Sequence, residues 1–322
     1  MKVGFIGLGN VGGKLAGSLL RNGFDLTVMD QKAELMDDFA ARGAGTAQTP
    51  VALMRQSDVV ITCLPSPSAS AAVMDEMLQE VGPGKIWLEM STTDEAEIRR
   101  LAALVQDKGG AAVDCPVSGG CHRADTGNIS IFAGCERPTF ETVLPLLTCL
   151  GRRVLHTGPV GTASTLKVMT NYLATANLLT CCEALVTMKA AGIDLATTYE
   201  AIRISSGNSF VHETESQLIL NGSRDVNFTM DLILKDLGLF EAIAQRANVP
   251  LEISPMIVEI MKDGQARYGT RANTDDIIRR LEEATGLSVL ADGFPAELVD
   301  DEPEEPGYEV FPPGAQRPVA AE

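Results

Sequence analysis

Hydrophobic positions in the first half of the chain alternate between short apolar runs and stretches with helical spacing. The short runs have the length of buried strands and occupy residues 2–6, 25–29, 58–64, 85–89, 111–114, 129–133 and 152–155. Stretches with helical spacing lie among them at residues 13–20, 94–107 and 138–149. Strands that alternate with helices are typical of a parallel sheet covered on both faces, so the pattern predicts an α/β domain over residues 1–160.

The pattern of the second half is helical throughout. A long apolar stretch runs from residue 161 to about residue 191, and shorter helical patterns follow at residues 194–203, 212–220, 230–247, 251–264 and 274–285. The sequence therefore predicts a second, all-α domain over residues 161–290, joined to the first by the long helix. The cleft between two such domains is where we expect the chemistry.

A glycine-rich turn separates the first apolar run from the first helical stretch. It reads Gly7-Leu8-Gly9-Asn10-Val11-Gly12. Glycines at this spacing between a strand and a helix match the dinucleotide fingerprint, in which they allow a tight turn, the approach of a pyrophosphate and close packing of helix on sheet. The turn predicts a Rossmann-type domain in which Gly7, Leu8, Gly9, Asn10, Val11 and Gly12 contact the cofactor. A glycine turn without a ligand is the alternative interpretation.

Asp30 ends the second apolar run, at the position where an acid hydrogen-bonds the adenosine ribose. A carboxylate there repels a 2′-phosphate, so NAD is the predicted cofactor. Lys32 lies two residues further on, and NADP is not excluded.

Two further strand ends are expected to line the cofactor groove, because ligands of open parallel sheets bind beyond the carboxyl ends of the strands. The first is the turn at Leu64 and Pro65, and the second is the turn at Ser91 and Thr92. Alternatively, Ser91 or Thr92 caps the helix that follows.

Lys167 is the one formally charged side chain, with His counted as neutral, between residues 154 and 182. A helix without charge is expected to be buried, and a buried ammonium must find a partner or lose its proton. Asn171 lies one helical turn later on the same face. Lys167 is therefore a candidate acid/base group beside an amide, and a lysine that snorkels to the surface is the alternative.

A loop rich in small residues follows the run at 111–114. Ser118-Gly119-Gly120 offers a hydroxyl and accessible backbone amides, which suit a carboxylate, and Arg123 can add a charge-assisted contact to an anion. Cys121 and His122 are two metal-ligand types without spaced partners, so no metal site is predicted.

Composition narrows the class of protein. The chain has 322 residues, 45% of them hydrophobic, and a formal net charge of −17, which argues against a nucleic-acid partner. Seven cysteines without framework spacing indicate a reducing compartment, and the N-terminus shows no signal or transit pattern, so a cytoplasmic protein is expected. The central apolar stretch contains too many Thr, Ser and Asn residues for a membrane span.

Residues 291–322 have a different composition. They contain nine acidic side chains, one arginine and six prolines. Such a segment cannot build a core, and we expect a disordered or loosely attached tail.

Taken together, four motifs resemble the β-hydroxyacid dehydrogenase family over about residues 1–290. They are the glycine turn at 7–12, Asp-Cys-Pro-Val-Ser-Gly-Gly at 114–120, the segment at 158–171, and Lys-Asp-Leu-Gly-Leu at 235–239. The resemblance implies that Lys167 is catalytic, that Asn171 binds substrate and that Ser118 and Gly119 cradle a carboxylate. It also implies that Thr92 and Lys235 contact the nicotinamide end of the cofactor. Before the resemblance, a solvated Lys235-Asp236 pair is an equal alternative.

The expected reaction is reversible hydride transfer between nicotinamide and a small 3-hydroxy acid resembling 3-hydroxyisobutyrate, with Lys167 as general acid/base. A reductase of tartronate, glyoxylate or succinic semialdehyde, or of a sulfonate analogue, is the first alternative. An imine reductase and a non-catalytic cofactor-binding scaffold are the others, and Lys167 argues against both. The family resemblance also implies a homo-dimer or homo-tetramer.

Overall fold

The computed structural model describes residues 1–315, which divide into two compact units. Unit 1 comprises Met1–Lys167 together with the chain from Asp300 onward, and unit 2 comprises Val168–Val299. The division falls inside a single helix, α8 (Thr162–Ala190).

Unit 1 is built on a sheet with the strand order β10-β9-β8-β6-β5-β4-β1-β2-β3. The strands are β1 (Lys2–Ile6), β2 (Asp25–Met29), β3 (Gly45–Thr46), β4 (Val59–Thr62), β5 (Ile86–Glu89), β6 (Ala111–Asp114), β7 (Val117–Ser118), β8 (Ile129–Gly134), β9 (Gly151–Gly158) and β10 (Tyr308–Val310). From β3 to β6 the strands are parallel and follow the order of a dinucleotide-binding domain. β8 is antiparallel to β6, and β9 and β10 continue parallel to β8. The predicted α/β fold is confirmed.

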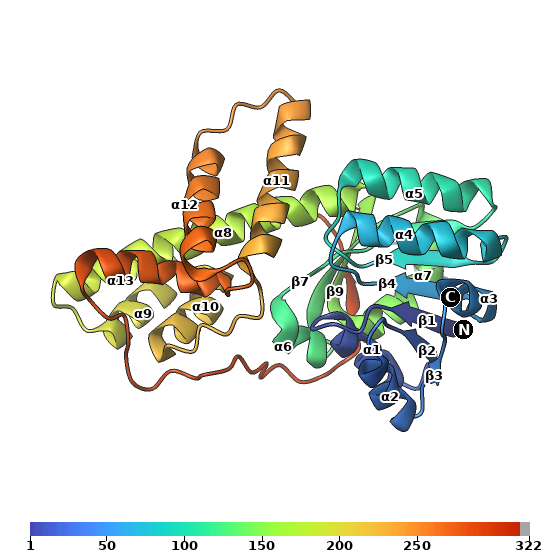
Figure 1. Cartoon of the computed structure of the whole chain (residues 1–322), viewed down its shortest axis with the longest axis horizontal. Coiled ribbons are helices and arrows are strands. Elements are labelled where there is room, and N and C mark those ends of the chain that lie inside the picture. The colour runs from blue at the N-terminus through green and yellow to red at the C-terminus, as the bar shows by residue number, and fades with distance from the viewer. Residues whose placement is uncertain (316–322) are drawn as a thin grey trace. The chain divides into compact units, whose positions relative to one another are not determined.

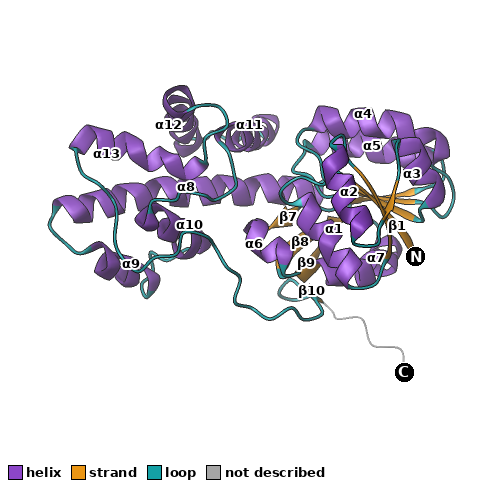
Figure 2. Cartoon of the chain, turned by 60° about the horizontal axis from the view of Figure 1, so that its bottom comes forward, coloured by secondary structure: helices purple, strands orange, loops and turns teal. Residues whose placement is uncertain are grey.

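Helices cover both faces of this sheet (Figure 1, Figure 2). They are α1 (Gly12–Arg21), α2 (Ala33–Ala41), α3 (Pro50–Gln56), α4 (Pro67–Met77), α5 (Glu95–Asp107), α6 (Gly120–Asp125) and α7 (Arg137–Leu150). One core contains Leu15 of α1 and Phe140 of α7 against Phe5 of β1. The other contains Met74 of α4 and Leu101 of α5 around Trp87 of β5. Because both faces are buried, the central strands are apolar along their whole length, which made them recognisable in the sequence.

Two short elements, β7 and α6, lie between β6 and β8 and were not predicted. β7 pairs antiparallel with β8 through Val117 and Ser118. Elements of this length contain too few residues to display a hydrophobic period, so only tertiary contacts define them.

Unit 2 is helical, as predicted. It contains the larger part of α8, then α9 (Leu195–Arg203), α10 (Phe210–Asn221), α11 (Met230–Arg246), α12 (Ile253–Tyr268), the short 3-10 helix η2 (Thr274–Ile278) and α13 (Arg279–Thr285). Its core packs Leu185 of α8 against Ile219, Leu237 and Met261 of later helices. Figure 1 shows these helices in yellow to orange around α8.

The tail differs from the expectation of disorder over residues 300–311. β10 extends the sheet of unit 1 in register with β9, pairing Tyr308 with Arg153 and Val310 with Leu155. Glu309 forms hydrogen bonds of 2.5 and 3.0 Å with the guanidinium of Arg137. Five of the acidic side chains that made this segment look unable to fold therefore pair with arginines of unit 1: Asp300, Glu302, Glu304, Glu305 and Glu309. Residues 316–322 lie outside the described part of the chain.

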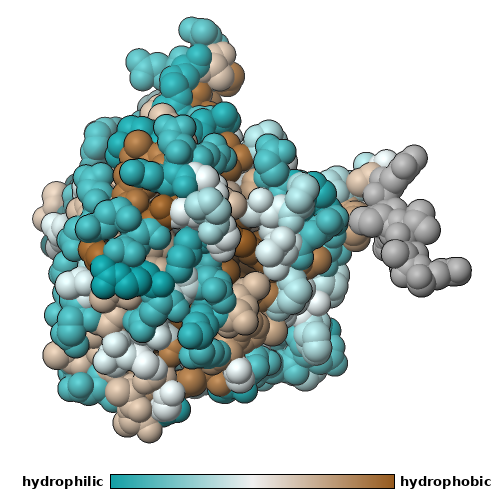
Figure 3. Space-filling model, turned by 90° about the vertical axis from the view of Figure 1, so that its right-hand side faces the viewer, coloured by the Kyte–Doolittle hydropathy of each residue, from teal (hydrophilic) through white to brown (hydrophobic). Residues whose placement is uncertain are grey.

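Hydrophilic side chains cover much of the face of the molecule seen in Figure 3, with hydrophobic ones interspersed. Among the described residues, no helix combines the length and the apolar character that crossing a membrane requires.

Candidate active site

The glycine turn after β1 has the shape that a pyrophosphate requires. Gly7 has φ +100°, and a Cβ there would lie 2.3 Å from the carbonyl oxygen of Cys63. A Cβ at Gly12 would lie 2.0 Å from the carbonyl oxygen of Gly7, whereas a Cβ at Gly9 would meet nothing within 4 Å. Two glycines are therefore needed for packing, and the third leaves open space at the N-terminus of α1, where backbone N–H groups favour an anion. The residues present fit a dinucleotide cofactor.

Asp30 is attached directly to this turn. Its Oδ2 accepts a hydrogen bond of 2.7 Å from the backbone N–H of Leu8, and its Oδ1 accepts one of 2.9 Å from that of Lys32. The carboxylate thus lies at the end of β2 beside the glycine turn, as the sequence predicted for a ribose contact.

A buried glutamate supports the strand ends expected to line the groove. Glu89, at the end of β5, is fully buried and accepts hydrogen bonds from the Ser91 N–H at 2.9 Å and the Thr62 hydroxyl at 3.1 Å. Ser91 in turn accepts a hydrogen bond of 2.7 Å from the backbone N–H of Leu64. Burial raises the pKa of Glu89 despite these bonds. Sequence reasoning missed this residue, although an acid inside an apolar run was a visible signal.

The alternative role of Ser91 or Thr92 as a helix cap is wrong. Asp94 caps α5, because its side chain accepts hydrogen bonds from the backbone N–H groups of Ala96 at 2.8 Å and Glu97 at 3.1 Å. Thr92 is half-buried in the turn between β5 and this cap.

Asp114 connects the end of β6 to the beginning of α8. Its carboxylate is fully buried and accepts hydrogen bonds from the Gly161 N–H at 3.0 Å, the Ser164 N–H at 2.8 Å and the Ser164 hydroxyl at 2.6 Å. Burial raises its pKa more than these bonds lower it. An acid at a helix N-terminus also stabilises the helix dipole. Asp114 therefore fixes the first turn of the helix that carries Lys167.

Lys167 lies one and a half turns into α8 and is buried, with 8% of its surface exposed. Its Nζ donates a hydrogen bond of 3.3 Å to the hydroxyl of Ser118. The structure thus brings together two residues that the sequence predicted as catalytic and substrate-binding. Gly119 and Gly120 follow Ser118 with φ of +131° and +86°, values that L side chains rarely adopt.

Arg123, predicted to bind an anionic group of the substrate, lies against the tail. Its guanidinium forms an ion pair of 3.3 Å with Glu302 and is 4.0 Å from Asp300. Burial, and then the charge of Arg123, lower the pKa of the neighbouring His122. Within residues 1–315, no three His, Cys, Asp or Glu side chains converge as metal ligands would.

In unit 2, Asp236 contacts two of the predicted site residues, Asn171 and Lys235. Its carboxylate accepts a hydrogen bond of 2.5 Å from the Asn171 side-chain amide and forms an ion pair of 3.2 Å with Lys235. The Asp236 residue is 1% exposed, so the alternative of a solvated Lys235-Asp236 pair is wrong. The sequence did not show that Asn171 and Lys235 share one buried carboxylate.

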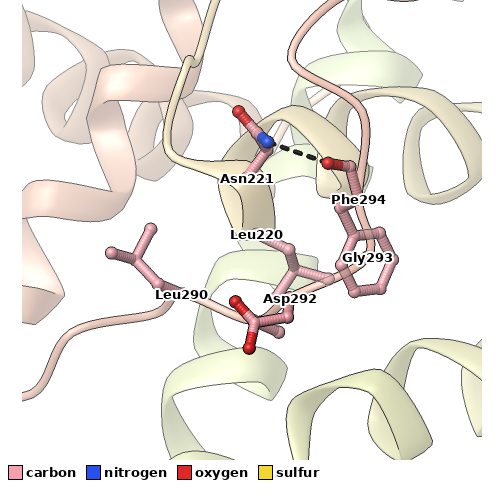
Figure 4. Close-up of a pocket in the computed structure, with 7 residues that line it drawn as sticks. Leu220, Asn221, Leu290, Asp292, Gly293 and Phe294 are labelled. Carbon is pink, nitrogen blue, oxygen red and sulfur yellow. Dashed lines mark hydrogen bonds between the residues drawn. The ribbon is translucent and has the colours of Figure 1, made fainter.

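Unit 2 also has a shallow hollow of about 330 Å³ between α10 and the segment after α13, shown in Figure 4. The amide of Asn221 donates a hydrogen bond of 2.8 Å to the carbonyl of Phe294 at its edge. None of the predicted site residues lines it.

Both halves of the chain match known protein families. Residues 2–158 match the family described as the NAD-binding domain of 6-phosphogluconate dehydrogenase, and residues 161–281 match the NAD-binding family of NADP-dependent 3-hydroxyisobutyrate dehydrogenase. The chain is 31% identical over 293 residues to 2-(hydroxymethyl)glutarate dehydrogenase from Eubacterium barkeri, covering 90% of this chain and 97% of that protein.

Two further proteins are similar. An NAD-dependent L-serine dehydrogenase from Pseudomonas aeruginosa is 32% identical over 254 residues, which cover 76% of this chain and 85% of the relative. The crystal structure of a 3-hydroxyisobutyrate dehydrogenase from Salmonella typhimurium superposes with a TM-score of 0.78 at 25% identity, covering 87% of this chain and 99% of that one.

The fold, the glycine turn and these relatives define an NAD(P)-dependent oxidoreductase. Within that class, the chain belongs to the β-hydroxyacid dehydrogenase family, which confirms the resemblance drawn from its motifs.

Proposed function

We propose that this protein catalyses reversible hydride transfer between nicotinamide and the carbinol carbon of a small 3-hydroxy acid, with Lys167 as the general acid/base. The observation that supports it most is that the buried Nζ of Lys167 lies within hydrogen-bond distance of Ser118, in the loop expected to hold the substrate. The nicotinamide supplies the hydride acceptor. What remains for the chain is to bind the acid, orient its hydroxyl and move one proton.

The proton step needs a base near the substrate hydroxyl. During oxidation, the neutral amine of Lys167 takes the hydroxyl proton while the C–H bond breaks and its electron pair leaves as hydride. During reduction, the ammonium returns that proton to the nascent alkoxide. By the family resemblance, Asn171, whose amide donates a hydrogen bond to Asp236, is a ligand of the substrate. The known effect of a positioned acid or base is about 10²- to 10⁴-fold in rate.

The substrate class follows from what the loop and the relatives have in common. 2-(Hydroxymethyl)glutarate, serine and 3-hydroxyisobutyrate all carry a hydroxymethyl group on the carbon next to a carboxylate. They differ in the other substituent of that carbon. Ser118, Gly119 and Gly120 present a hydroxyl and two glycine amides for such a carboxylate, so we propose a substrate of the type hydroxymethyl-CHR-carboxylate.

NAD is the proposed cofactor in preference to NADP. The Asp30 carboxylate lies beside the glycine turn and is held there by the N–H groups of Leu8 and Lys32. A 2′-phosphate at the ribose would meet this negative charge. We expect Asp30→Ser to lower the ratio of kcat/KM with NAD to kcat/KM with NADP about tenfold, because the repulsion between the carboxylate and the 2′-phosphate is lost.

The test is the rate of NADH formation with 3-hydroxyisobutyrate, serine, 2-(hydroxymethyl)glutarate, glycerate and 4-hydroxybutyrate, for the native protein and for Lys167→Ala. We expect oxidation of at least one acid with the hydroxymethyl group next to the carboxylate, and poor oxidation of 4-hydroxybutyrate, whose hydroxyl lies one carbon further away.

The matched control is Lys189→Ala, which removes the other lysine of α8 near its C-terminal end. This variant should keep the native rate. A native protein that oxidises none of these acids with either cofactor, or a Lys167→Ala variant with an undiminished rate, contradicts the proposal.

A further inference from the structure

The C-terminal segment from residue 300 to residue 310, here called the acidic strap, is bound to the loop that follows Ser118. Asp300 lies at the centre of the contact, with 3% of its side chain exposed. It accepts hydrogen bonds from the Thr126 hydroxyl and from the Asn128 amide, the latter at 2.8 Å. The same amide donates a bond of 2.8 Å to the carbonyl of Glu302, so two residues of the strap, Asp300 and Glu302, hold the end of α6.

Helix α6 needs such support, because it is six residues long and its beginning is weak. Its N-cap is Gly119, which provides no side-chain hydrogen bond. Gly119 and Gly120 both have positive φ and lose much conformational entropy when they are fixed. A helix of this length is not stable without tertiary contacts.

Arg123 links the strap to the glycines. Its guanidinium pairs with Glu302, while its Cδ lies 3.4 Å from where a Cβ of Gly119 would be. The stem of this arginine therefore covers the glycine that is proposed to cradle the carboxylate, and its charge is held by the strap.

The rest of the strap is fixed along unit 1. The backbone N–H of Gly307 donates a bond of 2.8 Å to the carbonyl of Thr148, Arg152 pairs with Glu305, and β10 completes the sheet edge beside β9, as Figure 2 shows. The match to the family of the second unit ends at residue 281, before the strap begins.

We propose that Asp300 is a positioning residue for the substrate, which acts through Arg123, Thr126 and Asn128 to hold α6 and thereby the Gly119-Gly120 backbone in its binding conformation. This inference rests on the proposed function of that loop. Arg123 is accordingly an anchor for the strap, and its charge is compensated before any substrate binds. Burial opposes ionisation of Asp300, but the hydrogen bonds from Thr126 and Asn128 outweigh it and lower the pKa of the carboxyl group.

The kinetic test compares Asp300→Ala and Asp300→Asn with Asp301→Ala, which removes the same charge from the exposed neighbouring residue. For Asp300→Ala we expect the KM of the hydroxy acid to rise about tenfold, equivalent to ~1.4 kcal/mol, with an unchanged Kd for NADH. Asp300→Asn keeps an oxygen acceptor and should show a smaller rise. Asp301→Ala should match the native protein.

An unchanged KM in Asp300→Ala overturns the proposal. An equal loss of NADH affinity also overturns it, because that pattern indicates general destabilisation of unit 1. A rise in KM of the same size in Asp301→Ala would show a non-specific charge effect and would also overturn the proposal.

Hydrogen exchange gives a readout that does not depend on catalysis. Amides in the segment 117–128 should exchange about tenfold faster in Asp300→Ala than in Asp301→Ala, because the ties at the end of α6 are lost. Equal exchange in the two variants refutes the role of the strap, even in an active enzyme. If the native protein oxidises no hydroxy acid, the proposed function fails and exchange alone decides whether the strap holds the loop.

Discussion

Lys167 and Lys235 were both predicted as site residues, yet their surroundings differ. Lys167 is buried on α8, and its Nζ donates to a hydroxyl, that of Ser118, at 3.3 Å. Lys235 is on α11 with 25% of its side chain exposed, and its Nζ lies 3.2 Å from the carboxylate of Asp236. A lysine beside a carboxylate serves as a fixed positive charge, whereas the proposed reaction requires Lys167 to exchange a proton with the substrate hydroxyl. Under the proposed function, the two lysines therefore have different tasks.

The largest expected effect separates these two lysines. Lys167→Ala should lower kcat about 10³-fold without changing the Kd for NADH, because it removes the proton carrier and no cofactor contact. Lys235→Ala should lower kcat/KM by only about tenfold, the effect of one lost charged contact. Steady-state kinetics and fluorescence titration with NADH measure both. A larger loss of kcat in Lys235→Ala than in Lys167→Ala would reverse the assignment of roles.

Variants of Asp236 test the surroundings of Lys235 directly. Asp236→Ala removes the acceptor of the Asn171 amide and the partner of Lys235, and should lower kcat/KM by about 10- to 100-fold. Asp236→Asn keeps an oxygen acceptor for either Asn171 or Lys235, so its kcat/KM should fall less than that of Asp236→Ala. The ranking of the three proteins in kcat/KM tests this, and equal values in all three would show that the buried carboxylate has no part in the reaction.

The Asp114 carboxylate binds backbone N–H groups at the start of α8, the helix that carries Lys167, whereas the Asp236 carboxylate binds side chains. Asp114→Ala should lower the free energy of unfolding by about 3 kcal/mol, because it leaves the donors at Gly161 and Ser164 buried without an acceptor. Asp114→Asn should cost about 1 kcal/mol, since its oxygen still accepts from the backbone and the hydroxyl of Ser164 can accept from its amide. Urea denaturation measures both. A cost for asparagine equal to that for alanine would contradict this.

The smallest expected effect concerns Glu215 and Asp275, two neighbouring carboxyl groups in unit 2. Burial raises the pKa of Glu215 to about 7, and burial and the charge of Glu215 raise that of the fully buried Asp275 well above its usual range. Between pH 4.5 and about 7 the folded state binds more protons than the unfolded state, so stability should fall as pH rises through this window.

Glu215→Gln removes the titrating group of that pair and is the matching variant. Its melting temperature at pH 8 should exceed that of the native protein by about 2–4 °C, and its pH dependence should be flatter. Melting curves at pH 5 and pH 8 are sufficient. A native protein that is more stable at pH 8 than the variant would refute the raised pKa.

The fold was predictable where burial is regular. Parallel strands covered on both faces are continuous apolar runs, and the helices of unit 2 repeat their apolar positions over several turns, so both were found in the sequence. The acidic strap was not, because its partners are far away in the chain: Glu302 pairs with a residue 179 positions earlier. Composition showed its acids and prolines but not the arginines that meet them.

The predicted site residues show the same limit. Lys167 was conspicuous because it is an isolated charge in an apolar helix that belongs to a family motif. Asp114 and Asp236 were visible as residues of motifs, but their burial and their hydrogen bonds depend on packing that no local pattern contains. Arg123 had the right residue type for an anion and turned out to face Glu302.

The most direct test of the central claim is chemical rescue of Lys167→Ala. Hydride transfer to NAD is measured at saturating hydroxy acid with increasing concentrations of ethylamine. Ethylamine can occupy the space of the missing side chain and accept the proton of the substrate hydroxyl in its place. For Lys167→Ala we expect a rate about 10³-fold below native without amine and a saturable increase with amine, and for Lys189→Ala we expect no effect of amine. A Lys167→Ala rate equal to that of the native protein in the absence of amine would contradict the proposed role of Lys167.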